Sequence, residues 1–271
     1  MTRCLSLHQL CALEAGPTEL VDIAHRAGFD HLCIFVRGLD DRPSTSWPLL
    51  DAAGAPAFRA RLDATGISVL NLEIFVLTPQ VDVMDFAPAL ALGRSVGGRS
   101  ATVVIRDDDE GRAADNLARF SELAAEFQIR VGLEFMAFSP VRTLADAVRL
   151  VRASGHDNAG ITVDILHMVR NGVPMAALAA LDPRLISYAQ LCDGPLAHPP
   201  ADLQRDEATR NRLPPGEGAF PLRDFLAALP AGQPVAVEVP LHDRRDQQGM
   251  GADARASLLM RRTRALLAEA A

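Results

Sequence analysis

Short apolar runs recur along the whole chain, and each is followed by a segment in which apolar residues return every three or four positions. The runs are almost continuously apolar, which is typical of strands that are buried on both faces of a parallel sheet. Strands are therefore predicted at residues 3–7, 31–36, 68–74, 101–105, 130–135, 160–165, 185–191 and 234–239. This alternation predicts an α/β fold.

The segments between the predicted strands have the periodicity of helices. Examples are TELVDIAHRAG, AADNLARFSELAAEF, TLADAVRLVRASG and PLRDFLAALP, which carry Gly, Pro or Asp near their ends. Eight strand–helix units in a chain of 271 residues predict a single (β/α)8 TIM barrel over residues 1–271, closed by the last helix, ADARASLLMRRTRALLAEA. An open doubly wound sheet is the alternative, but no G-x-G-x-x-G follows the first strand.

A long polar stretch at about residues 194–219 separates the seventh and eighth predicted strands. Loops of this length inside a compact domain are usually functional or disordered. In a barrel this loop would follow the C-terminal end of a strand, so we expect it on the active-site face.

The amino-acid composition excludes several classes of enzyme mechanism. The chain has 27 Lys+Arg, and none of them is a lysine. Schiff-base aldolases, pyridoxal-phosphate enzymes and Walker-type phosphate loops are excluded, because each needs a lysine side chain. The net charge of -7 opposes nucleic acid or an anionic membrane as the main partner.

The expected location is the cytoplasm. The four cysteines form no C-x-x-C pair, and the N-terminus lacks the apolar core of a signal peptide. No apolar run approaches the roughly 20 residues of a membrane span. We therefore expect reduced thiols and no membrane segment.

Four successive strands end with an oxygen-bearing side chain inside an apolar run: Glu134 in VGLEFM, Asp164 in ITVDIL, Gln190 in SYAQLCD and Glu238 in VAVEVP. Each alone could be a helix cap or a salt-bridge partner. Together, at the mouth of a barrel, three carboxylates and one carboxamide need a cation. One divalent metal ion suits such oxygen ligands better than arginines do: manganese or magnesium is predicted, and cobalt or zinc would also be compatible.

Two further residues are candidates for contact with a substrate. His167 follows Asp164 in DILH, where it could move a proton or be a hydrogen-bonded structural histidine. Arg212, which precedes LPPGEG, could bind a carboxylate, a phosphate or a developing enolate oxygen. Arg205 and Arg210, in the same loop, could equally be solvated charges.

Weaker candidates lie on the same predicted rim, and each could instead be a structural polar residue: His8, Arg37, Glu73 and Arg106. Cys192 lacks a base and is expected to be a packing residue. The acidic run DDDE, at residues 107–110, is expected to begin a helix.

The motifs AGFDHLCIF, GLEFM, VDILHM, YAQLCDGP, RLPPGEG and AVEVP, in this order and spacing, resemble the xylose-isomerase-like barrels. These include sugar-phosphate isomerases and epimerases, ketose epimerases, inosose dehydratases and dehydroshikimate dehydratases. The resemblance implies that Glu134, Asp164, Gln190 and Glu238 hold the metal and that His167 and Arg212 face the substrate. Ketose epimerases usually have histidine where this chain has Gln190, and several dehydratases have glutamine there.

The resemblance and the chemistry of these residues predict an isomerase or epimerase of a sugar or polyhydroxy ketone. Glu134 or Glu238 would remove a proton to give an enediolate, and His167 or the second Glu would return it, with His8, Glu73 and Arg205 contacting the small polyhydroxylated substrate. Expelling a β-hydroxyl instead would make a dehydratase, and a non-catalytic sugar-binding barrel is the third alternative. The absence of lysine disfavours the hydride shift of xylose isomerase itself. The chain also has too few histidines for the multinuclear zinc site of the endonuclease IV branch. A homodimer or homotetramer is compatible with the family.

Overall fold

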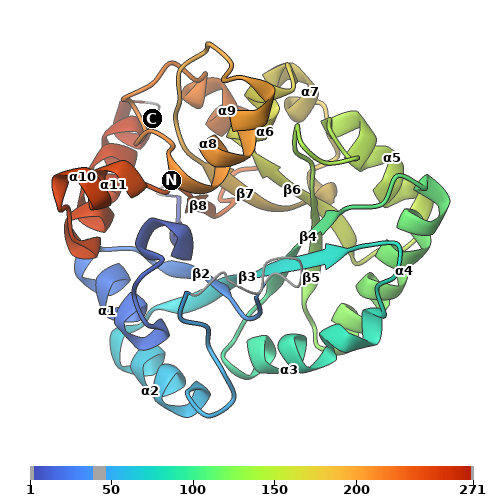
Figure 1. Cartoon of the computed structure of the whole chain (residues 1–271), viewed down its shortest axis with the longest axis horizontal. Coiled ribbons are helices and arrows are strands. Elements are labelled where there is room, and N and C mark those ends of the chain that lie inside the picture. The colour runs from blue at the N-terminus through green and yellow to red at the C-terminus, as the bar shows by residue number, and fades with distance from the viewer. Residues whose placement is uncertain (1–2, 39–46, 270–271) are drawn as a thin grey trace.

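The computed structural model describes residues 3–38 and 47–269, and in it parallel strands form a closed barrel in the order β1 to β8. Figure 1 looks along the barrel, with the helices around it. The prediction of a (β/α)8 barrel is confirmed, and the open-sheet alternative is wrong because β1 also pairs with β8. The strands are β1 (Leu5–His8), β2 (His31–Phe35), β3 (Ser68–Leu77), β4 (Ser100–Ile105), β5 (Arg130–Glu134), β6 (Ala159–Asp164), β7 (Ile186–Leu191) and β8 (Val235–Val237).

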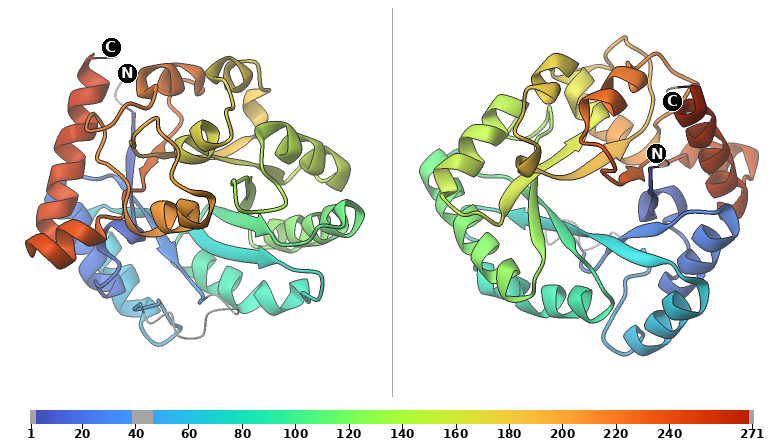
Figure 2. Two further views of the ribbon diagram at one scale, coloured as in Figure 1. Left: turned by 45° about the horizontal axis from the view of Figure 1, so that its top comes forward. Right: turned by 180° about the vertical axis from the view of Figure 1, so that it is seen from behind.

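The helices surround the barrel, as the two views of Figure 2 show. They are α1 (Pro17–Ala27), α2 (Ala55–Thr65), α3 (Ala87–Ser95), α4 (Glu110–Glu126), α5 (Leu144–Ser154), α6 (Ile165–Arg170), α7 (Met175–Ala179), α8 (Gln204–Arg210), α9 (Leu222–Ala228), α10 (His242–Gln248) and α11 (Ala252–Glu269). Short 3-10 turns are η1 (Gln9–Ala12), η2 (Val83–Phe86), η3 (Pro183–Leu185) and η4 (Ala201–Leu203).

Local sequence signals explain where several helices begin and end. Thr143 and Asp146 form a reciprocal capping box at the start of α5, and Gly155 ends that helix with φ 64°, a left-handed conformation that glycine adopts without strain. Asp109 caps α4 by accepting a hydrogen bond from the Arg112 backbone N–H. The prediction that the DDDE run begins a helix is therefore confirmed.

The ends of the strands differ from the sequence-based prediction at the site. The predicted eighth strand, 234–239, is longer than β8, so Glu238 lies just beyond the paired residues. Its backbone N–H still donates to the Leu191 carbonyl at 3.0 Å, which keeps the chain extended there. Conversely, β3 runs to Leu77, past the predicted end at residue 74.

The core has an apolar shell and a polar layer. Between the barrel and its helices, Phe75, Phe86 and Phe120 pack against one another with ring centroids 5.0–5.4 Å apart. Fully buried polar side chains bond to one another across the strands, as Asn71 does to Thr102 at 2.9 Å. This polar layer continues into the residues of the candidate site.

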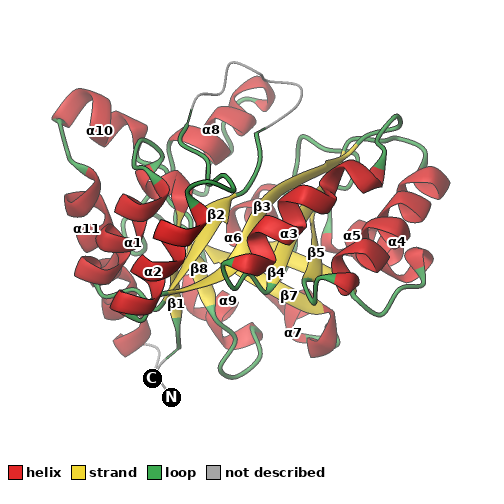
Figure 3. Ribbon diagram, turned by 90° about the horizontal axis from the view of Figure 1, so that it is seen from below, coloured by secondary structure: helices red, strands yellow, loops and turns green. Residues whose placement is uncertain are grey.

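The segment between β7 and α9, predicted as a long loop at about residues 194–219, contains η4 and α8. Figure 3 shows α8 and α10 at one end of the barrel and both ends of the described chain at the other. Within residues 3–38 and 47–269, no helix is both long and apolar enough to cross a bilayer.

Candidate active site

A cavity of about 700 Å³ opens among the loops that follow the strands. Its inner wall includes buried ionisable side chains, and aromatic and arginine side chains line the remainder. The predicted residues that line it are Glu73, Arg106, Glu134, His167, Arg205, Arg210, Arg212 and Glu238, whereas the predicted ligands Asp164 and Gln190 are not among its lining residues. Strands or loops far apart in the sequence therefore bring these candidates to one place, as expected for a TIM barrel.

Arg212 joins two of the predicted ligands. Its Nη1 donates to Asp164 Oδ2 and its Nη2 to Glu238 Oε1, both at 2.8 Å, and all three side chains are buried. Burial opposes the charge on Arg212, but the two carboxylates raise the pKa of the guanidinium further above its ordinary value. One arginine thus compensates for part of the negative charge that the sequence predicted at this point.

The loop that carries Arg212 is anchored by a buried aspartate. The Asp193 carboxylate accepts hydrogen bonds from the backbone N–H groups of Gly194, Gly216, Gly218 and Phe220 at 2.8–3.0 Å. Gly216 has φ 82°, so the tight backbone around the carboxylate uses glycine's freedom at this position. Because the loop is anchored in this way, the guanidinium of Arg212 has a fixed place in the cavity wall.

Glu134 and His167 form the other side of the site. His167 Nε2 lies 3.8 Å from Glu134 Oε1 and 3.9 Å from Asp164 Oδ2. Burial and the neighbouring carboxylates of Glu238, Asp164 and Glu73 raise the pKa of Glu134 well above its usual range. Burial lowers the pKa of His167 to about 4, so its imidazole is neutral near pH 7.

Burial also raises the pKa of Glu238 to about 7, although Arg212 and His8 lower it. A carboxyl group with this pKa can hold or release a proton near neutrality, which is what acid–base chemistry requires. Glu238 Oε2 lies 3.9 Å from His8 Nε2.

The remaining predicted ligand, Gln190, contacts Glu73. Gln190 Nε2 donates to Glu73 Oε1 at 3.1 Å, and His8 Nε2 lies 2.8 Å from Glu73 Oε2. His8 is fully buried and is hydrogen-bonded to the cavity wall through Glu73. Glu73 itself lines the cavity, as the sequence predicted for a rim residue.

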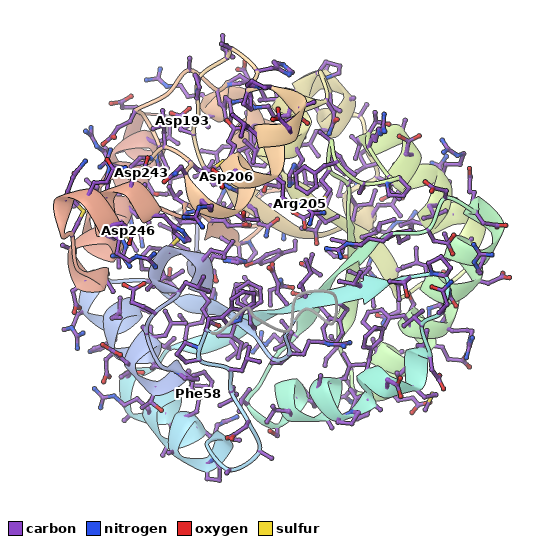
Figure 4. All side chains as sticks on the ribbon, in the orientation of Figure 1. Phe58, Asp193, Arg205, Asp206, Asp243 and Asp246 are labelled. Atoms are coloured by element: carbon purple, nitrogen blue, oxygen red, sulfur yellow. The ribbon has the colours of Figure 1, made fainter. Side chains whose placement is uncertain are left out.

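The weaker candidates occupy different positions. Arg205 lies on α8 with its guanidinium carbon 5.3 Å from the Phe138 ring centroid, and Figure 4 places it towards the middle of the barrel face. Arg106 and Arg210 also line the cavity. The guanidinium of Arg37 lies over Phe86, 4.4 Å from the ring centroid.

Cys192 lies beneath the site. Burial raises the pKa of its thiol well above the usual range, and its Sγ accepts a hydrogen bond from Arg212 Nη1 at 3.6 Å. A buried thiol with such a pKa is a poor nucleophile, in agreement with its expected packing role.

Several residues of the cavity wall were not predicted from the sequence: Phe35, Trp47, Phe138 and His242. Trp47 is the only tryptophan in the chain, and that rarity was the one available signal. It packs on Phe35 with ring centroids 5.1 Å apart. Apolar faces of this kind suit the C–H surfaces of a sugar or cyclic polyol.

The residues present fit a divalent cation. Gln190 Oε1 and Glu238 Oε2 are buried and lack a hydrogen-bond partner among the described residues. Such oxygens are costly unless something pairs with them. Ligand atoms of Glu134, Asp164 and His167 also lie within 4.8 Å of one another. Hard oxygen donors with one imidazole nearby match the preferences of manganese, magnesium or zinc.

The chain belongs to the xylose isomerase-like TIM barrel family, whose model matches residues 21–262. Among curated proteins it is similar to two inosose isomerases. That of Bacillus velezensis is 27% identical over 128 residues, 46% of this chain and 44% of the relative. That of Halalkalibacterium halodurans is 28% identical over 171 residues, 61% of this chain and 59% of the relative. The matches thus span about half the length of these relatives.

Solved structures show the same fold at low sequence identity. An IolI protein with a bound zinc atom superposes with a TM-score of 0.79 at 19% identity, over 99% of both chains. An L-ribulose 3-epimerase gives 0.71 at 16% identity, over 99% of this chain and 94% of the other. The probable 3-DHS dehydratase AsbF of Bacillus anthracis gives 0.73 at 13% identity, over 95% and 97%.

Proposed function

We propose that the protein is a divalent-metal-dependent isomerase or epimerase of a sugar or polyhydroxy ketone, acting by proton abstraction. The observation that carries the proposal is the pair Glu134 and Glu238. Both carboxylates line one cavity, and burial raises the pKa of each. The family and the names of the inosose isomerase relatives support the same class of reaction and a cyclic or open-chain polyol ketone as substrate.

The metal would be held by Glu134, Asp164, Gln190 and Glu238. A divalent ion bound there supplies a Lewis acid that polarises the carbonyl of the substrate and acidifies the adjacent C–H. Arg212 bonds to Asp164 and Glu238, so beside a divalent ion it would balance the remaining negative charge of the three carboxylates.

Glu134 and Glu238 exchange the proton. One carboxylate removes the proton from the carbon next to the carbonyl, and the other returns it to the opposite face or to the neighbouring carbon. His167 is neutral near pH 7, so it can donate a hydrogen bond to the oxygen of the enediolate while staying uncharged. Arg205 and Glu73, on the cavity wall, would contact hydroxyl groups of the substrate.

A dehydratase is the second candidate, and Gln190 favours it. Several dehydratases among the xylose-isomerase-like barrels have glutamine at the matching position, whereas ketose epimerases usually have histidine. In that case the same carboxylate would remove the proton, and the second would protonate a departing β-hydroxyl.

The experiment measures whether the protein exchanges the proton on the carbon next to the substrate carbonyl. The protein, loaded with Mn²⁺, is incubated in D₂O with inososes, ketohexoses and dehydroshikimate, and each mixture is followed by NMR and ultraviolet absorbance. Deuterium at the carbon next to the carbonyl together with a new isomer or epimer is the expected result. An unsaturated product with no epimer would establish the dehydratase instead, and binding without exchange would favour a non-catalytic barrel.

A further inference from the structure

The carboxamide of Gln190 has two different ends, and they meet different surroundings. Its nitrogen donates to Glu73 Oε1 at 3.1 Å. Its oxygen is buried and has no hydrogen-bond partner among the described residues. Only the oxygen end of a carboxamide can bind a cation, so the orientation of this side chain decides whether it can be a ligand.

Glu73 receives N–H groups from three directions. His8 Nε2 lies 2.8 Å from its Oε2, and Asn71 Nδ2 donates to its Oε1 at 3.1 Å, in addition to the bond from Gln190. Glu73 is only 4% exposed, and Asn71 and His8 are fully buried. A carboxylate that only accepts hydrogen bonds matches three donors, and a neutral amide in its place would not.

Two of the side chains that donate to Glu73 are themselves held by further hydrogen bonds. The backbone N–H of Leu10 donates to His8 Nδ1 at 3.1 Å, so the ring proton that faces Glu73 is on Nε2. Asn71 Nδ2 also donates to Thr102 Oγ1 at 2.9 Å, while its Oδ1 accepts from Ser100 Oγ at 2.8 Å. With its nitrogen towards Glu73, the Asn71 amide bonds to the carboxylate as well as to both hydroxyls, whereas a turned amide would place its oxygen against the carboxylate.

We propose that Glu73 is a positioning residue, which holds the nitrogen of Gln190 and thereby turns the carboxamide oxygen towards the metal. This inference rests on the proposed function, because it concerns the same metal centre. Groups that bond to a metal ligand from outside commonly fix its orientation, and their loss weakens metal binding. A carboxamide can turn either its oxygen or its nitrogen towards the metal. The hydrogen bond from the Gln190 nitrogen to Glu73 selects the orientation with the oxygen towards the metal.

The same geometry argues against Glu73 as a ligand of a second ion. His8, Cys33 and Glu73 do offer ligand atoms within 4.8 Å of one another. However, both nitrogens of His8 are engaged, and burial raises the pKa of the Cys33 thiol to about 12. A cation would have to displace these bonds, and His8 and Cys33 are fully buried.

Exchanging the carboxylate and the carboxamide tests the orientation. In Glu73→Gln, the new amide must place an N–H against either the His8 N–H or the Gln190 N–H, and in the second case Gln190 turns its nitrogen towards the metal. Gln190→Glu places two carboxylates against each other. In the double variant, the amide at position 73 can accept from His8 and donate to the carboxylate at position 190, whose second oxygen then faces the ion. Asn71 loses its acceptor at position 73 in this orientation, in the double variant as in Glu73→Gln, so that loss is common to both.

The measurement is calorimetric titration of Mn²⁺ into the metal-free full chain, without substrate, with thermal unfolding of the metal-free protein alongside. We expect the Kd to rise about 10- to 100-fold in Glu73→Gln and to rise also in Gln190→Glu, although that variant adds a negative charge to the site. The double variant should recover to within about 3-fold of the parent value. Thr162→Val, which removes a hydroxyl of the same polar layer, should lower the melting temperature with less than about 2-fold change in Kd.

Each outcome has a distinct meaning. An unchanged Kd in Glu73→Gln would overturn the positioning role and leave the proposed function intact. Tighter binding by Gln190→Glu, or a double variant no better than the single ones, would show that charge or general stability matters rather than orientation. A parent protein that binds no Mn²⁺ would overturn the proposed metal centre, and this inference with it.

Discussion

The buried carboxylates on the two sides of the site have different neighbours. On one side, Arg212 lies between Asp164 and Glu238, with both N–O distances at 2.8 Å. On the other side, His167 Nε2 lies 3.8 Å from Glu134 Oε1, and burial lowers the pKa of His167 to about 4. Glu134 therefore faces a neutral ring, whereas Glu238 faces a permanent guanidinium cation.

The difference separates two tasks. The arginine side keeps one fixed positive charge between its two carboxylates whether or not an ion is present, so it can act as the fixed part of the site. Beside Glu134 the imidazole of His167 is neutral, and burial with three neighbouring carboxylates raises the pKa of Glu134 although Arg212 lowers it. We infer that the ion contributes most on this side, and that Glu134 is the carboxylate whose chemistry depends on it most.

The largest expected effect is on catalysis by Glu134→Gln. The amide keeps the size and one oxygen ligand but cannot remove a proton, so we expect the initial rate to fall by about 10²- to 10⁴-fold. The rate is measured on the substrate identified by deuterium exchange, with Mn²⁺ saturating.

Glu238→Gln is the matched comparison, because its oxygen can still accept from Arg212. A smaller loss than in Glu134→Gln would support Glu134 as the base. Full activity in both variants would contradict the proposed mechanism.

The fold could be predicted because each strand of a parallel barrel is an apolar run in the sequence, and because apolar residues recur every three or four positions in each helix. The end of β8 was misplaced because Glu238 and Val239 continue the apolar, buried pattern after strand pairing stops. Burial alone does not reveal where pairing stops, since the last hydrogen bonds depend on the neighbouring strand.

The predicted metal ligands could be singled out because an oxygen-bearing residue in an apolar run is unusual. Their partners could not be found in this way. Arg212 meets Asp164 across 48 residues, and Gln190 meets Glu73 across 117 residues and the width of the barrel. Such pairs follow from strand register and from the anchored loop, neither of which leaves a periodic signal in the sequence.

Replacing Arg212 tests the side of the site where Asp164 and Glu238 share one cation. In Arg212→Met, two buried carboxylates lose their shared cation, so we expect the metal-free protein to lose about 3–5 kcal/mol in free energy of unfolding. Urea denaturation of the metal-free protein measures this loss.

Saturating Mn²⁺ should restore part of the lost stability, since the ion supplies positive charge to the same carboxylates. Arg212→Lys is the control that keeps one charge but not the two-pronged geometry, and it should lose less. Equal stability of the parent and Arg212→Met would show that the buried pair contributes nothing net.

The smallest expected effect is the pH dependence of stability in the metal-free protein. The pKa of Glu238 is about 7 in the folded chain and about 4.5 when exposed, so the folded state holds this proton more tightly. Its stabilising contribution is complete below pH 4.5 and is lost as pH rises to about 7, and Glu134 shifts in the same direction. Urea unfolding at a series of pH values should show a decline of about 3 kcal/mol from this source. Glu238→Gln should flatten it, and Mn²⁺ should oppose it by favouring the charged carboxylates. A parent protein and a Glu238→Gln variant with parallel pH profiles would remove the basis for treating Glu238 as a proton carrier near neutrality.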